Sequence, residues 1–127
     1  MMVNIQKQID YWINGAENDF ATAELLIREK RTLHGLFFCH LVIEKAIKAH
    51  VAKNSNDFVP KSHNLIYLSE KADLTFDNDT EIFLGILMKY QLQGRYPDYN
   101  PTLPNSSQIE AYITQTKKLL QWLKEKL

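Results

Sequence analysis

Apolar residues recur at intervals of three and four along most of this 127-residue chain, and this spacing constrains the fold more than any other feature. It places the apolar side chains on one face of an α-helix, whereas a β-strand requires strict alternation. The first such series consists of Ile5, Ile9, Trp12, Ile13, Ala16, Phe20, Ala23 and Ile27. No proline interrupts it, so we predict a helix over about residues 4–29. No segment alternates for long enough to predict a strand.

The second helix is predicted after a turn at "EKRTLHG", with Thr32 as a candidate N-cap. It spans about residues 33–53, and its broad inner face includes Cys39, His40 and His50. A short helix over about residues 62–72 follows a loop rich in Asn, Ser and Pro.

The last two long helices have clearer end signals. Asp79 is a candidate N-cap for a helix that ends near Gly94, a residue type that suits the position just beyond a helix. The final helix opens at "NSSQIE", where Ser107 and Glu110 have the spacing of a capping box. We therefore predict an all-α fold, an up-and-down bundle of four long helices plus one short helix, in a single domain over residues 1–127.

Composition narrows the classes of function. The 15 basic and 15 acidic residues give a formal net charge of zero, which disfavours a nucleic-acid binder of the basic-arm kind but leaves a local basic patch open. One cysteine, Cys39, cannot form an internal disulfide, and no signal peptide or membrane span is apparent. We expect a cytoplasmic protein that does not bind membranes. No zinc spacing or nucleotide-binding glycine motif is present, so we expect no metal and no cofactor.

Two sets of polar residues are candidates for function. His40, Glu44 and Lys48 are spaced four apart and form one row on the second helix. This row is either a solvated helix edge with a Glu44–Lys48 pair, or a polar seam in which Glu44 orients His40 and Lys48 meets a phosphate. His63, at the start of the short helix, is predicted to be a capping or surface residue.

The other set lies in "YQLQGRYPDYNP", residues 90–101. Pro97 forces Tyr96 into an extended conformation, so the turn after Gly94 is rigid. This is either a plain interhelical turn with an Arg95–Asp98 ion pair, or a support that holds the Arg95 fork toward a phosphate.

Four segments resemble the HEPN family (higher eukaryotes and prokaryotes nucleotide-binding domain). "YWINGAENDFATAELLI" at 11–27 is similar to the family's first helix, and "CHLVIEKAIKAHV" at 39–51 to its second. "HNLIYLSEKA" and "YQLQGRYPD" resemble its short helix and the Arg-Tyr-Pro that leads into its last helix. The resemblance covers nearly the whole chain in the family's order.

The resemblance implies a helical bundle, usually a homodimer, linked to nucleotides or RNA. Many bacterial members sit beside a minimal nucleotidyltransferase as a toxin–antitoxin pair. The ribonuclease branch carries an Arg, four to six residues and a His, but no histidine follows Arg95 in this sequence. Metal-independent RNA cleavage near neutral pH usually needs such an acid/base group.

We therefore expect a homodimer that binds a nucleotide or RNA phosphate, or a partner such as a nucleotidyltransferase, and that does not catalyse a reaction itself. Arg95 and Lys48 would bind the phosphate, with Tyr96, Asp98, His40 and Glu44 around them. The alternative is a ribonuclease toxin with a degenerate or relocated site, in which Arg95 and His40 are the candidate catalytic residues.

Overall fold

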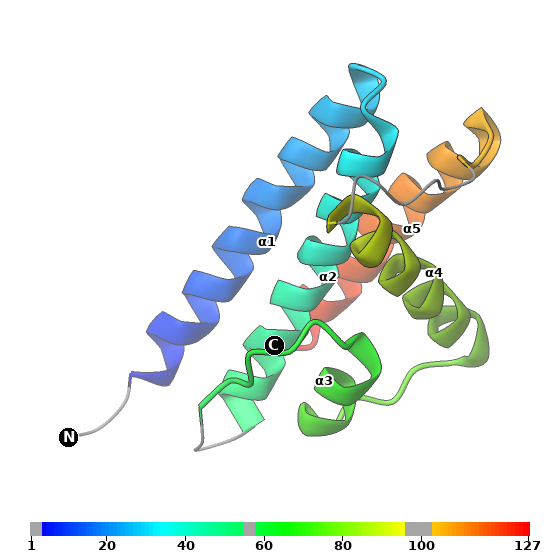
Figure 1. Cartoon of the computed structure of the whole chain (residues 1–127). Coiled ribbons are helices and arrows are strands. Elements are labelled where there is room, and N and C mark those ends of the chain that lie inside the picture. The colour runs from blue at the N-terminus through cyan, green and yellow to red at the C-terminus, as the bar shows by residue number, and fades with distance from the viewer. Residues whose placement is uncertain (1–3, 55–57, 96–102) are drawn as a thin grey trace.

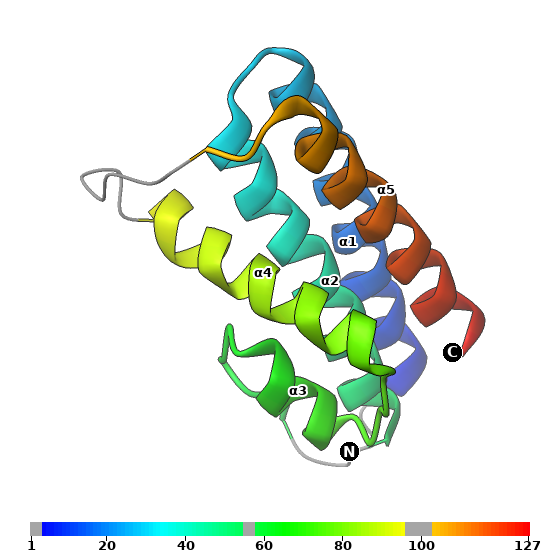
Figure 2. The ribbon, with the colours of Figure 1, turned by 90° about the vertical axis from the view of Figure 1, so that its right-hand side faces the viewer.

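The computed structural model describes residues 4–54, 58–95 and 103–127; for residues 92–95 it describes the backbone alone. These residues form five helices and no strand (Figure 1), so the predicted all-α class is confirmed. The helices are α1 (Ile5–Arg28), α2 (Thr32–Asn54), α3 (Leu65–Lys71), α4 (Asn78–Arg95) and α5 (Ser106–Glu125). The four long helices alternate in direction along the bundle, with the short α3 at one end (Figures 1 and 2).

Helix α2 lies at the centre of the bundle and contacts the other four helices. Fourteen of its 23 residues are buried, whereas α1 buries fully only two, Ala16 and Ala23. The sequence shows the same difference, because α1 has one apolar stripe and α2 is apolar around most of its circumference. None of the helices in the described ranges is long and apolar enough to cross a membrane.

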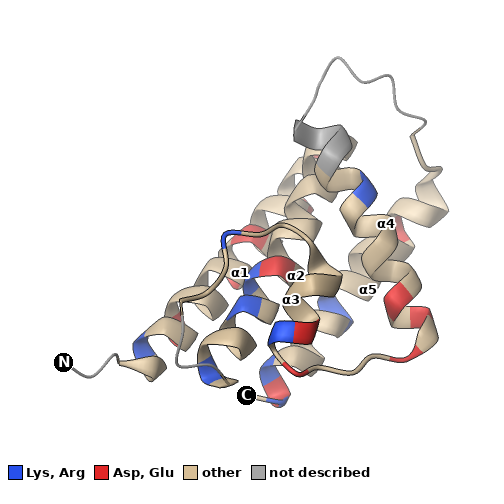
Figure 3. Ribbon diagram, turned by 60° about the horizontal axis from the view of Figure 1, so that its bottom comes forward, with Lys and Arg blue, Asp and Glu red and all other residues tan. Residues whose placement is uncertain are grey.

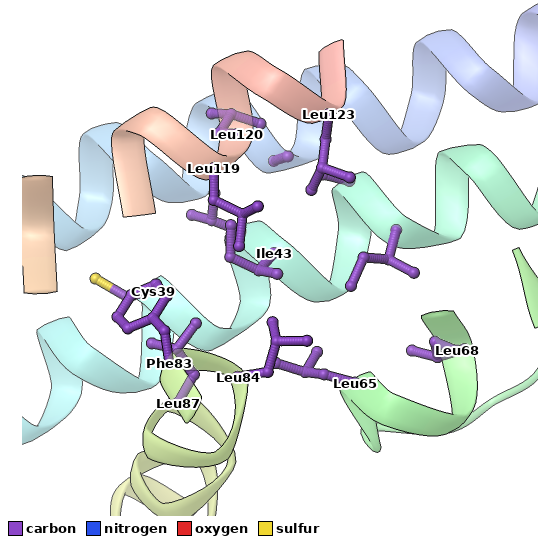
Figure 4. Packing of buried hydrophobic residues seen from close by; sticks show 14 of the residues in the cluster. Cys39, Ile43, Leu65, Leu68, Phe83, Leu84, Leu87, Leu119, Leu120 and Leu123 are labelled. Carbon is purple, nitrogen blue, oxygen red and sulfur yellow. The ribbon is translucent and has the colours of Figure 1, made fainter. Parts of the chain in front are cut away.

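The hydrophobic core fills the space between α2 and the helices around it (Figure 4). Figure 4 shows side chains from α2, α3, α4 and α5 converging; those labelled are Cys39, Ile43, Leu65, Leu68, Phe83, Leu84, Leu87, Leu119, Leu120 and Leu123. Burying each large apolar side chain contributes about 1.5–3 kcal/mol relative to leaving it in water. Burial raises the pKa of the Cys39 thiol to about 11, so this residue packs as a small apolar group and is no nucleophile.

The predicted N-caps of α2 and α4 are wrong by one and two residues. Thr32 is the first residue of α2 rather than the residue before it. Helix α4 is capped by Asp77, whose Oδ1 accepts the Thr80 backbone N–H at 2.8 Å, and Asp79 lies within the first turn. Where several capping residue types stand close together, the backbone path selects one of them.

The short helix and the last helix also begin at residues other than those predicted. Helix α3 begins three residues later than the predicted position 62, because the Asn64 side chain accepts the amide hydrogens of Ile66 and Tyr67. The capping box of α5 is formed by Asn105 and Gln108, not by Ser107 and Glu110. The backbone of Asn105, which follows Pro104, is extended, and this places the Asn105 side chain over the first turn of α5.

Helix α4 ends at Arg95, near the predicted position, but Gly94 lies within the helix and not just beyond it, so its predicted role is wrong. Among the described residues, left-handed positions close two helices, at Lys30 after α1 and Asp73 after α3, with φ of 61° and 56°. After α1, the Lys30 and Arg31 amides bond back to the Ile27 and Leu26 carbonyls, which is the Schellman arrangement. A non-glycine residue therefore takes the strained position in both turns.

Candidate functional site

The row formed by His40, Glu44 and Lys48 on α2 is buried, so the prediction of a solvated helix edge is wrong. Their exposed fractions are 0%, 4% and 6%. Two parts of the chain account for this burial. Trp12 of α1 places its ring centroid 5.3 Å from the Lys48 Nζ, and the segment before α3 brings His63 onto the row. We call these three α2 residues together with His63 the polar row.

Glu44 is the acceptor at the middle of the polar row. Its Oε1 accepts a hydrogen bond from the His63 Nδ1 at 2.8 Å, and its Oε2 accepts one from the Lys48 Nζ at 3.0 Å. Both carboxylate oxygens therefore have a donor, as a buried anion requires. The Lys48 ammonium gains a second favourable contact from the negative face of the Trp12 ring.

The His40 ring is held by the backbone of the segment before α3. Its Nε2 lies 2.9 Å from the His63 carbonyl oxygen, and because a carbonyl only accepts, Nε2 carries the hydrogen. The other ring nitrogen, Nδ1, lies 3.6 Å from the Glu44 Oε1. That distance exceeds a normal hydrogen bond, so Glu44 is a neighbour of His40 and does not set its tautomer.

His63 is the member that sequence reasoning missed. It was predicted to be a capping or surface residue, and its side chain is 42% exposed, but its imidazole reaches the buried Glu44. The cap of α3 is the next residue, Asn64. Helical spacing could not connect positions 44 and 63, since they lie on different elements. A usable signal was the adjacent asparagine, a better N-cap that leaves the histidine side chain for another partner.

His50, further along α2, has a structural partner. Its Nε2 donates to the Leu123 carbonyl oxygen at 2.8 Å and so ties α2 to the end of α5. Burial lowers the pKa of this imidazole, and the bond to Leu123 partly offsets the effect. His50 is therefore a neutral core histidine that satisfies a helix-end carbonyl.

Most of the predicted phosphate-binding turn lies outside the described residues. The backbone places Arg95 as the last residue of α4, while Tyr96 and Asp98 lie in the undescribed range 96–102. The proximity of Arg95 to the polar row and the Arg95–Asp98 ion pair both stay predictions. In the part of the chain that can be described, no three His, Cys, Asp or Glu side chains are grouped to hold a metal ion.

Surface charges of both signs are intermixed along α1, α2 and α3 (Figure 3). The start of α4 differs in carrying acidic residues, with Asp79 and Glu81 in its first turn. Basic positions are therefore accompanied by acidic ones along α1, α2 and α3, in line with the net charge of zero.

Comparison with known proteins gives the family. The family model for the HEPN domain matches residues 9–127. In structure, the chain is similar to TT1696 from Thermus thermophilus, with a TM-score of 0.76 and 23% sequence identity over 94% of this chain and 98% of that one. No curated protein shows significant sequence similarity. The structural match supports the fold, and the family model covers almost the whole length, so this chain belongs to the HEPN domain family.

Proposed function

We propose that this HEPN protein is a homodimer that binds the phosphate of a nucleotide or RNA without cleaving it. The observation that carries the proposal is family membership over residues 9–127, combined with a sequence that has no histidine after His63. The family is linked to nucleotides and RNA, and this chain lacks the second half of the Arg…His pair that its ribonucleases use. What remains is a binding module that carries an arginine at the end of α4.

The environment of His40 supports the non-catalytic form of this proposal. A general acid or base must reach the reacting atom within hydrogen-bond distance. The His40 side chain is fully buried, and its Nε2 is bonded to the His63 carbonyl. A relocated ribonuclease site would require the segment around His63 to move first.

Arg95 carries more of the proposed binding than Lys48 does. The Lys48 ammonium is bonded to Glu44 in a nearly buried position, so a phosphate contact would replace one anion by another. An arginine at a helix end can instead offer two parallel N–H groups to a phosphate. In this proposal Tyr96 stacks on a base and Asp98 orients the arginine.

The test is binding of a labelled RNA oligonucleotide and of nucleotides to the purified protein, with its Arg95→Ala variant beside it. Because a charge-assisted hydrogen bond contributes about 1.5–3 kcal/mol, affinity should fall about 10- to 100-fold. Arg28→Ala, at the exposed end of α1, is the matched control and should leave affinity unchanged. Equal loss in both variants would mean that the contact is non-specific.

Two further measurements separate the alternatives. RNA cleavage that is abolished by His40→Gln, but not by the exposed control His34→Gln, would replace our proposal by the ribonuclease toxin. If the parent protein binds neither nucleotide nor RNA, the proposal becomes a module that binds a partner protein such as a minimal nucleotidyltransferase, in a toxin–antitoxin pair. Sedimentation at tens of micromolar tests the dimer in either case.

A further inference from the structure

A cavity of about 330 Å³ lies between the segment that precedes α4, the first turns of α4, and α5. Its wall includes Phe76, Asp77, Asp79, Phe83, Lys118 and Trp122. The volume is at the lower end of the roughly 300–1,000 Å³ that small-molecule sites occupy in proteins. No member of the polar row lines it, and it lies at the first turns of α4, at the opposite end of that helix from Arg95, so it is separate from the site proposed above.

Four of the ten residues that line the cavity are apolar: Phe76, Phe83, Leu119 and Trp122. The rings of Phe76 and Trp122 lie with their centroids 5.6 Å apart and their planes inclined by 50°. Phe83 and Leu119 also line the cavity and are buried, with 3% and 9% exposure. Phe83 and Leu119 are core residues and Phe76 and Trp122 pack against the core, so the surface is rigid and suits a flat apolar body.

Two carboxylates give this apolar surface its polarity. Asp77 caps α4 through its Oδ1, and the Thr80 hydroxyl and amide that bond to it lower the pKa of this carboxyl. Asp79 follows in the first turn of the helix. The cationic side chain on the opposite wall is Lys118 of α5, so the charged side chains of the wall sum to one negative charge. The partial positive charge at the start of α4, about half a unit, reduces the net negative charge of the wall but does not reverse its sign.

We propose that this cavity binds a small flat aromatic ligand carrying a positively charged, donor-rich group of the amidine or guanidine class. The ring packs against Phe76, Phe83 and Trp122, and the cation faces Asp77 and Asp79. Aromatic faces attract cations as well as apolar bodies, so both parts of the wall favour the same ligand. A carboxylate and an amidinium can form two parallel hydrogen bonds, which fixes the ligand's orientation as well as its charge.

The probe is benzamidine, with benzamide as the neutral compound of nearly the same shape and benzoate as the anionic one. Amide and tryptophan indole resonances in ¹H–¹⁵N NMR spectra report both the affinity and the place of binding. We expect benzamidine to bind several-fold more tightly than either control compound, because an ion pair with an exposed carboxylate adds only modestly to affinity. The shifts should centre on residues 75–83 and 115–122. Equal binding of all three compounds, or shifts elsewhere, would overturn the proposal.

Variants give a second test that does not depend on the compounds. Asp77→Asn removes a charge and keeps a residue type that is a good N-cap. Asp79→Asn also removes one charge, at a position that is not the cap. Each should weaken benzamidine binding several-fold, and Lys118→Ala should strengthen it. Asp10→Asn, on the exposed face of α1, is the control and should change nothing. Unchanged affinity in both aspartate variants, with normal melting temperatures, would show that the carboxylates do not recognise the cation.

Discussion

Neutralising Glu44 should destabilise this protein more than any other single charge removal on α2. In Glu44→Gln the shape is kept and the new amide oxygen still accepts from His63. The Lys48 ammonium, with 7% side-chain exposure, loses its counter-charge at 3.0 Å. Removing one partner of a buried ion pair costs about 3–5 kcal/mol, because the other charge stays desolvated. The contact with Trp12 offsets part of this, so we expect about 3 kcal/mol.

That loss is a large fraction of the roughly 5–15 kcal/mol by which domains are stable. At roughly 4 °C per kcal/mol for a domain of this size, it lowers the melting temperature by about 12 °C. Urea unfolding followed by circular dichroism gives the free energy directly. The decisive comparison is the double variant Glu44→Gln with Lys48→Met, which removes the unpaired charge and leaves a flexible apolar side chain against Trp12. It should recover at least half of the loss.

The control is Asp19→Asn, which breaks the 2.7 Å pair between Lys45 and Asp19. The Lys45 side chain is 29% exposed, so water solvates the remaining charge and the cost should stay below about 1 kcal/mol. If Glu44→Gln costs no more than this control, or the double variant is as unstable as the single one, burial of the pair is not what makes it important.

Three further predictions concern packing, capping and pH. Gly35→Ala drives a methyl group into the Ile27 side chain of α1 and should cost about 1–3 kcal/mol. Gly85→Ala meets nothing within 4 Å and should stabilise α4 by about 0.5–1 kcal/mol, and thermal melts of both variants check these values. Asn105→Ala should lower the free energy of unfolding, measured in urea, by about 1 kcal/mol, and Ser107→Ala by only a few tenths. The reverse order would mean that Ser107 is the N-cap, as predicted from the sequence. In the folded state the pKa of His50 is lowered from 6.5. Below pH 6.5 the unfolded state therefore takes up a proton that the folded state does not, so the stabilising contribution of His50 is fully present above pH 6.5 and is lost as the pH falls. The fall in unfolding free energy between pH 7.5 and 5 should therefore be smaller in His50→Gln than in the parent, and equal falls would contradict the assignment.

The helices themselves could be predicted because their signal is local. The spacing of Ile5 to Ile27 contains the whole of α1, and the nearly continuous apolar character of residues 36–52 indicates a central helix before any partner is known. The cap positions were harder. Between Asp77 and Asp79, or Asn105 and Ser107, the residue types are equally suitable, and only the direction of the incoming backbone decides which side chain reaches the free amides.

The sequence by itself determined that His40, Glu44 and Lys48 share one side of a helix, since four-residue spacing does so in any α-helix. Only the tertiary structure decided that this side is buried, because burial depends on where Trp12 and the segment before α3 come to lie. The same is true of His63, whose bond to Glu44 joins residues 19 positions apart. Local spacing sets which side chains face one way, and long-range packing sets what they face, which is why a row that suits a solvated edge became a buried ionic network.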